Sequence, residues 1–131
     1  MEKYKITPKL PIFLSKLFLA RIQFHVFHLQ VIGIGSFAQH IALDELYKGI
    51  VDLTDDLIET YQGKYGIVTG YKLEALQDDL SSKQVIQYIQ DLHDYIDTER
   101  VALFPDSDSL NIIDEIKSLL KTGLYKLKNL Q

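Results

Sequence analysis

Four side chains that can bind a metal ion recur at defined intervals in the first half of the chain. They are His28, His40, Asp55 and Glu59, separated by twelve, fifteen and four residues, and Asp44 lies between the second and the third. Imidazole nitrogens together with carboxylate oxygens suit Fe(II), Zn(II) or Mn(II). The pattern therefore predicts a metal site, provided that the fold can bring these side chains together.

A predicted helix over residues 37–62 determines which of these candidate ligands can bind the same metal ion. His40 and Asp55 are fifteen residues apart, which is about 22 Å along a helix, so they cannot bind one ion within one chain. His28 ends one predicted helix and His40 begins the next, so they can be neighbours, and Asp55 and Glu59 form an i, i+4 pair. These are two half-sites. An isologous dimer with antiparallel second helices would join each half to the complementary half of the partner and give two identical sites.

The elements that must position these residues are four long helices. Apolar residues recur at three- and four-residue steps over about 9–31, 37–62, 81–103 and 108–129, which is typical of helices packed against a core. Ser36 is a candidate cap for the second helix, Gly63 and Gly66 are expected to end it, and Ser81 with Gln84 forms a capping box for the third.

The stretch 63–79 is the least regular part of the chain, with a helical turn expected near residues 72–77. Roughly 17 extended residues can return along a helix of about 35 Å. The sequence therefore predicts one all-α domain over residues 1–131, a ferritin-like four-helix bundle with one long crossover between helices 2 and 3 and a short tail over residues 1–8.

Composition excludes several classes of protein. The chain has 131 residues, of which 47% are hydrophobic, and this is enough for a core. It has no cysteine, which rules out disulfides and thiol catalysis, and its net charge of −4 argues against a dedicated nucleic-acid binder. No signal peptide is recognised, and the apolar stretch 10–34 carries too many charged and histidine residues for a membrane span. We therefore expect a cytoplasmic protein, or one within a phage particle.

The sequence from His28 to Glu59 resembles the signature of the Dps family of mini-ferritins. It reads His28-Leu29-Gln30, then Phe37-Ala38-Gln39-His40-Ile41-Ala42-Leu43-Asp44-Glu45-Leu46, then Asp55 and Glu59, and every spacing of the family pattern is kept. The resemblance implies an Fe(II)-oxidising site at a subunit two-fold axis, with two histidines from one chain and Asp55 and Glu59 from the other. Asp44 would then help to bind a second iron or orient His40.

The resemblance further implies storage of ferric mineral in a twelve-subunit shell built from such dimers. The cofactor would be one or two iron ions, with zinc or manganese as alternatives. Two features depart from the family: Leu29 stands where a tryptophan usually follows the first histidine, and the chain is shorter than most members. The closest likeness is to short phage-encoded relatives.

Other interpretations remain open at this stage. The main alternative is a structural or decoration protein, for example of a phage virion, in which the same bundle carries a vestigial or structural metal site. A small helical regulator is a weaker alternative. Whether the chain is an enzyme is therefore undecided. His25 is a candidate support for a ligand, and a tail with Lys3, Lys5 and Lys9 would give at most weak, salt-sensitive DNA binding.

Overall fold

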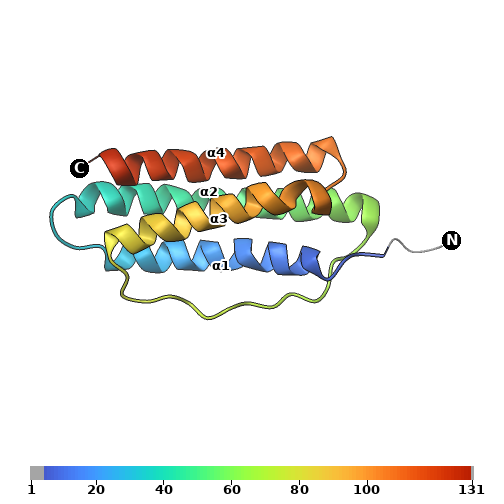
Figure 1. Ribbon diagram of the computed structural model, residues 1–131, viewed down its shortest axis with the longest axis horizontal. Helices are drawn as coiled ribbons and strands as arrows, with labels where there is room; N and C mark the ends of the chain where they lie inside the picture. The colour runs from blue at the N-terminus through green and yellow to red at the C-terminus, as the bar shows by residue number, and fades with distance from the viewer. Residues whose placement is uncertain (1–4, 131) are drawn as a thin grey trace.

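A computed structural model describes residues 5–130 as a bundle of four helices, with no strand in that part of the chain (Figure 1). The helices are α1 (Lys9–Gln30), α2 (Ser36–Tyr65), α3 (Ser82–Leu103) and α4 (Ser107–Asn129). The all-α class and the four predicted helices are confirmed. Lys3 of the basic tail lies outside the described residues, whereas Lys5 and Lys9 are exposed.

The helices pack in a ring in which α1 lies against α2, α2 against α4, α4 against α3, and α3 against α1. Helices α2 and α3 are thus diagonal neighbours, although they follow each other in the sequence. The connection between them, residues 66–81, runs back along α1 for the length of the bundle (Figure 1). As a result α2 and α3 point the same way, and each is antiparallel to the helix that it is joined to by a short loop.

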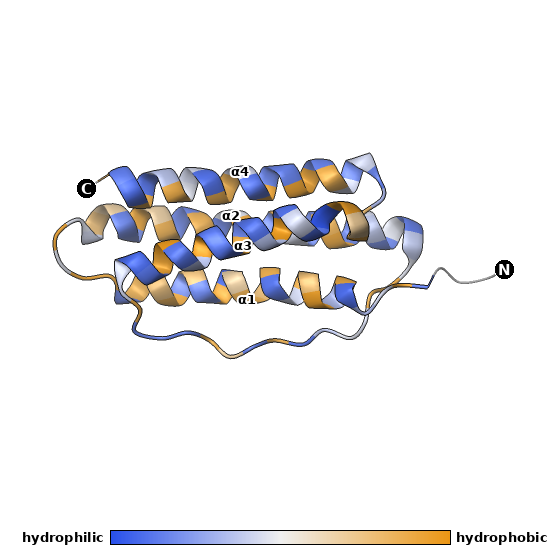
Figure 2. Ribbon diagram, viewed as in Figure 1, coloured by the Kyte–Doolittle hydropathy of each residue, from blue (hydrophilic) through white to orange (hydrophobic). Residues whose placement is uncertain are grey.

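Apolar residues recur along each helix among polar ones (Figure 2), and buried apolar residues from all four helices form one core. The stripe of α1 includes Phe13, Leu17, Phe24 and Phe27, all of which are buried. By length and composition α1 could cross a membrane, but most of it is buried inside the bundle, as expected for a core helix. Its apolarity is therefore accounted for by packing.

Helices α2 and α4 approach closely at Gly123. A Cβ atom built on Gly123 would lie 2.7 Å from Cδ2 of Leu46, closer than such atoms can come. The absence of a side chain at Gly123 therefore makes room for a leucine of the core.

The crossover is held to α1 by side-chain amides and hydroxyls. Gln23, which is fully buried, donates from Nε2 to the carbonyl of Gln77 and accepts from its amide, both at 2.7 Å. The amide of Lys72 donates to Oγ of Ser15 at 2.9 Å. The helical turn expected over residues 72–77 is therefore wrong: the segment is extended, because its backbone groups bond to α1 instead of to one another.

Two expectations about helix ends are also wrong. Ser36 is the first residue of α2, and the cap position belongs to Gly35, with φ of 81°. Gly63 lies inside α2, which continues to Tyr65 and ends at Gly66, with φ of 95°. The capping box of α3 is confirmed: Oγ of Ser81 accepts from the amide of Gln84, whose side chain accepts from the amide of Ser81.

Candidate functional site: a histidine clasp

The histidine pair lies where α1 ends and α2 begins. Gly33 and Gly35, both at positive φ, turn the chain sharply between the two helices. This turn brings the ring of His28 against the ring of His40, with centroids 3.5 Å apart and planes 23° apart. The side chain of His28 is buried, and that of His40 is half-buried. The structure therefore brings together the two histidines that the sequence placed twelve residues apart.

The two histidines are joined by reciprocal hydrogen bonds, which we call the histidine clasp. Nδ1 of His28 lies 2.7 Å from the carbonyl oxygen of His40, and Nδ1 of His40 lies 2.8 Å from the carbonyl oxygen of His28. A carbonyl oxygen only accepts, so Nδ1 carries the hydrogen in both rings. In a neutral imidazole the remaining nitrogen, Nε2, then keeps its lone pair. The clasp therefore prepares both rings for metal ligation through Nε2.

A third imidazole and a phenol border the clasp. His25 stacks on Tyr47, with ring centroids 4.3 Å apart and planes 15° apart, and its ring lies 6.1 Å from that of His28. Tyr47 also meets His28 edge-on at 5.3 Å. His25, proposed from the sequence as a support for a ligand, is thus exposed and stacks on Tyr47, whereas its ring is tilted by 51° to that of His28 and makes no hydrogen bond to the clasp.

Asp44 lies one helical turn after His40 and is engaged within its own chain. Its Oδ2 is 2.9 Å from Nζ of Lys48. The hydrogen bond from Lys48 lowers the pKa of Asp44 below its ordinary value of 3.8, and a hydrogen bond from Tyr47 acts in the same direction. The bond to Asp44 in turn raises the pKa of Tyr47. Asp44 is thus ionised at neutral pH, and its carboxylate accepts hydrogen bonds from both Lys48 and Tyr47.

Asp55 and Glu59 are exposed near the other end of α2, far from the clasp. Together with Asp52 and Asp56 they place four carboxylates within about two turns, and none of the four forms an ion pair within the described residues. Among these residues no group of three or more histidine, aspartate or glutamate side chains could hold a metal ion. A single chain therefore presents the two predicted halves separately.

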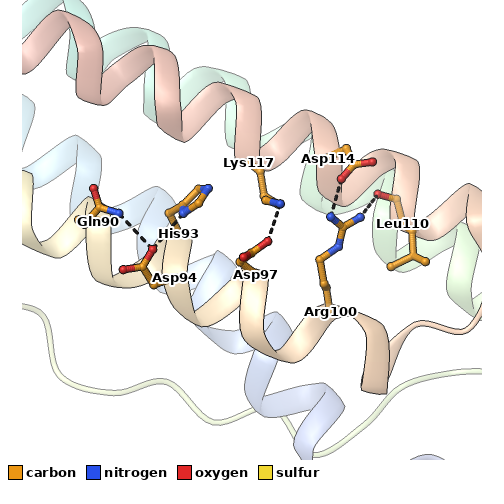
Figure 3. Close-up of polar contacts among 8 residues, drawn as sticks. All are labelled: Gln90, His93, Asp94, Asp97, Arg100, Leu110, Asp114 and Lys117. Carbon is orange, nitrogen blue, oxygen red and sulfur yellow. Dashed lines mark hydrogen bonds and ion pairs between the residues drawn. The ribbon is translucent and has the colours of Figure 1, made fainter.

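The seam between α3 and α4 is polar, and the sequence analysis did not single it out (Figure 3). Arg100 pairs with Asp114 at 2.6 Å and donates to the carbonyl of Leu110, and Lys117 pairs with Asp97, also at 2.6 Å. These contacts join residues ten to twenty positions apart, so only the register of two facing helices could reveal them. They add polar contacts to the apolar packing of α3 and α4 in the core.

Comparison with known protein families gives one match, a family of unknown function (DUF5856), over residues 28–127. The match covers most of the chain. The chain belongs to this family. The matched segment begins at His28 and therefore includes the clasp, Asp44, Asp55 and Glu59. No curated protein and no solved structure matches the chain.

Proposed function

We propose that this protein is a Dps-like mini-ferritin that oxidises Fe(II) at a site shared by two chains and stores the ferric product. The observation that carries the proposal is the histidine clasp. Its reciprocal Nδ1 hydrogen bonds leave Nε2 of His28 and His40 as lone-pair donors on one chain. Hydrogen bonds of this kind from the second ring nitrogen are typical of metal-binding histidines.

A second chain would supply the other half of the site. In an antiparallel pairing of α2 with the partner's α2, the clasp would face the partner's Asp55 and Glu59. Those carboxylates are exposed and form no ion pair with a basic side chain among residues 5–130, so a cation between them and the clasp would be favoured. Such a dimer contains two equivalent sites, and a closed dodecamer would contain twelve.

The metal ligands would come from both chains of the dimer. Nε2 of His28 and of His40 would donate from one side, and the carboxylates of the partner's Asp55 and Glu59 from the other, a mixed set that suits Fe(II) and admits Zn(II) or Mn(II). Asp44 would help to bind a second ion after leaving Lys48, and His25 would hold Tyr47 against the clasp. Iron is the substrate here, and peroxide or oxygen would accept its electrons, in the cytoplasm or within a phage particle.

A complementation experiment tests whether the site is shared. One chain carries His28→Ala and His40→Ala, and the other carries Asp55→Ala and Glu59→Ala. Each alone is expected to lose Fe(II) oxidation, read as ferric absorbance after anaerobic loading and addition of peroxide. After mixing and subunit exchange, activity should recover to about a quarter of the wild-type rate, since half of randomly formed dimers are mixed and each has one intact site. A site contained in one chain would give no recovery.

A structural role is the second candidate, and one surface favours it. Ile32, Ile34 and Phe37 around the α1–α2 turn, together called the apolar corner, are 89%, 97% and 78% exposed. Side chains of this kind gathered at one place mark a contact with another protein. Light scattering separates the candidates: a closed assembly of twelve chains supports storage, whereas a dimer that enters a larger particle supports a structural subunit.

A further inference from the structure

The apolar corner is a projecting feature at one end of the bundle. No charged residue occurs between Val31 and Gln39. The two glycines at positive φ, Gly33 and Gly35, make the turn tight, and nearly the whole of the Ile34 side chain is exposed between them. Leaving three large apolar side chains in water costs free energy, so burial of the corner against another protein surface would be favourable.

The opposite end of the bundle carries an apolar groove, which we call the end groove. It has a volume of about 400 Å³. Ile12 and Ile67 on its rim are 46% and 74% exposed, and of the residues that line it only Lys72 is charged. The groove is bordered by Ile6, Pro8, Pro11, Ile12 and Ile67. Its apolar lining suits an apolar occupant.

The register of the proposed dimer brings these two features together. If His40 lies level with the turn between the partner's Asp55 and Glu59, the two-fold axis passes near residues 48 and 49. Phe37 then lies level with the partner's residue 60, and Ile34, which precedes α2, lies beyond it, toward the partner's Ile67. We propose that the apolar corner of each chain occupies the end groove of a second copy. This inference rests on the dimer of the proposed function.

The size of such an interface is adequate for a stable dimer. Helix α2, with 30 residues, is about 45 Å long, and α1, with 22, is about 33 Å long. At a width of about 10 Å each, their outer faces offer roughly 800 Å² per chain, the usual area of a specific interface. The corner and the groove place apolar contacts at both ends of this area, where no ion pair has to be desolvated.

Cross-linking tests this placement, because the chain has no cysteine of its own. The double variant Ile34→Cys/Ile67→Cys is treated with a short bis-maleimide and run on a denaturing gel. The two positions lie at opposite ends of α2, about 45 Å apart, so they cannot be joined within one chain. A covalent dimer is expected from the double variant and none from Ile34→Cys or Ile67→Cys alone. The variant Lys48→Cys, beside the proposed axis, should cross-link by itself.

The outcomes separate this inference from the proposed function. A covalent dimer from Ile34→Cys alone would mean that corner packs on corner and would overturn the inference. So would a double variant that gives no covalent dimer while Lys48→Cys does, and in that case the pairing of α2 would stand. If Lys48→Cys and the double variant both fail, the dimer itself is wrong. Cross-linking as expected without Fe(II) oxidation would leave the inference intact and refute the ferroxidase.

A second variant tests, without a cross-link, how much the apolar corner contributes to the affinity of the dimer. Ile34→Asp is expected to weaken the dimer at least tenfold in sedimentation equilibrium, because a carboxylate cannot enter the end groove without losing water. Val101→Asp is the matched control: Val101 is 72% exposed on α3, which is not part of the proposed dimer interface, and its replacement should leave the dissociation constant unchanged. Equal effects of the two replacements would overturn the inference.

Discussion

His28 and His40 hold each other in place through the backbone: Nδ1 of each ring bonds to the carbonyl of the other residue. The same two bonds close the α1–α2 corner and direct both Nε2 lone pairs away from the backbone. A single arrangement would thus serve both stability and the proposed ligation. Substitutions that keep one property and remove the other can separate the two roles.

Asparagine should preserve the hydrogen bond of the clasp and lose the ligand. The amide nitrogen of Asn can replace Nδ1 as a donor, whereas nothing replaces Nε2. We expect His28→Asn to weaken Zn(II) binding at least about tenfold in calorimetry while costing less than about 1 kcal/mol of unfolding free energy. His28→Ala should lose both. His93→Ala, on α3, controls for loss of a histidine elsewhere, and unchanged Zn(II) binding in His28→Asn would refute the assignment of Nε2.

Removal of the Gln23 amide should release the crossover. Gln23→Leu removes both hydrogen bonds to the backbone of Gln77, at a cost of about 0.5–1.5 kcal/mol each, because Gln77 is exposed and water can replace the lost partner. We expect a lower unfolding free energy and faster proteolytic cleavage between residues 66 and 81. Gln30→Leu is the control, because Gln30 bonds to the same segment at an exposed site. Equal cleavage rates in the two variants would show that Gln23 is not the main tether.

Two glycine substitutions should change the unfolding free energy in opposite directions. Gly123→Ala puts a methyl group 2.7 Å from Leu46 and should destabilise the bundle by about 1–3 kcal/mol. Gly63→Ala, in a helical position with no atom within 4 Å of the added Cβ, should stabilise it by about 0.5–1 kcal/mol. Urea unfolding of both variants checks this. A neutral Gly123→Ala would mean that α2 and α4 can separate at no cost.

Acid should weaken the contact between the end of α2 and the start of α4. The hydrogen bond from Lys64, at 2.7 Å, and then that from Tyr65 lower the pKa of Asp106 below its ordinary value of 3.8. Because the folded-state pKa is depressed, the stabilisation is complete above the unfolded value and is lost as the pH falls through the folded value. Asp106→Asn should therefore flatten the fall in unfolding free energy below about pH 4. Asp56→Asn is the comparison, because it removes an exposed carboxylate that forms no ion pair with another described residue.

Local pattern was enough to predict the helices. The apolar periodicity located all four, and the Ser81–Gln84 spacing identified a cap, because these signals depend on residues within one or two turns. The cap of α2 was assigned to Ser36 instead of Gly35, and Gly63 was expected to end α2 together with Gly66. The sequence does not distinguish a glycine inside a helix from one at positive φ. The crossover was expected to contain a helical turn, and only its bonds to Gln23 and Ser15 on α1 explain why it is extended.

The sequence by itself determined the bundle's four helices and the spacing of His28, His40, Asp55 and Glu59 along them. From the helical rise alone it followed that the histidines and the carboxylates lie on separate halves. Only the tertiary structure decided that the two imidazoles form a clasp, that Gln23 fastens the crossover, and that Gly123 admits Leu46. Each of these depends on atoms brought together from different elements, and their distances are set by packing, which sequence spacing does not encode.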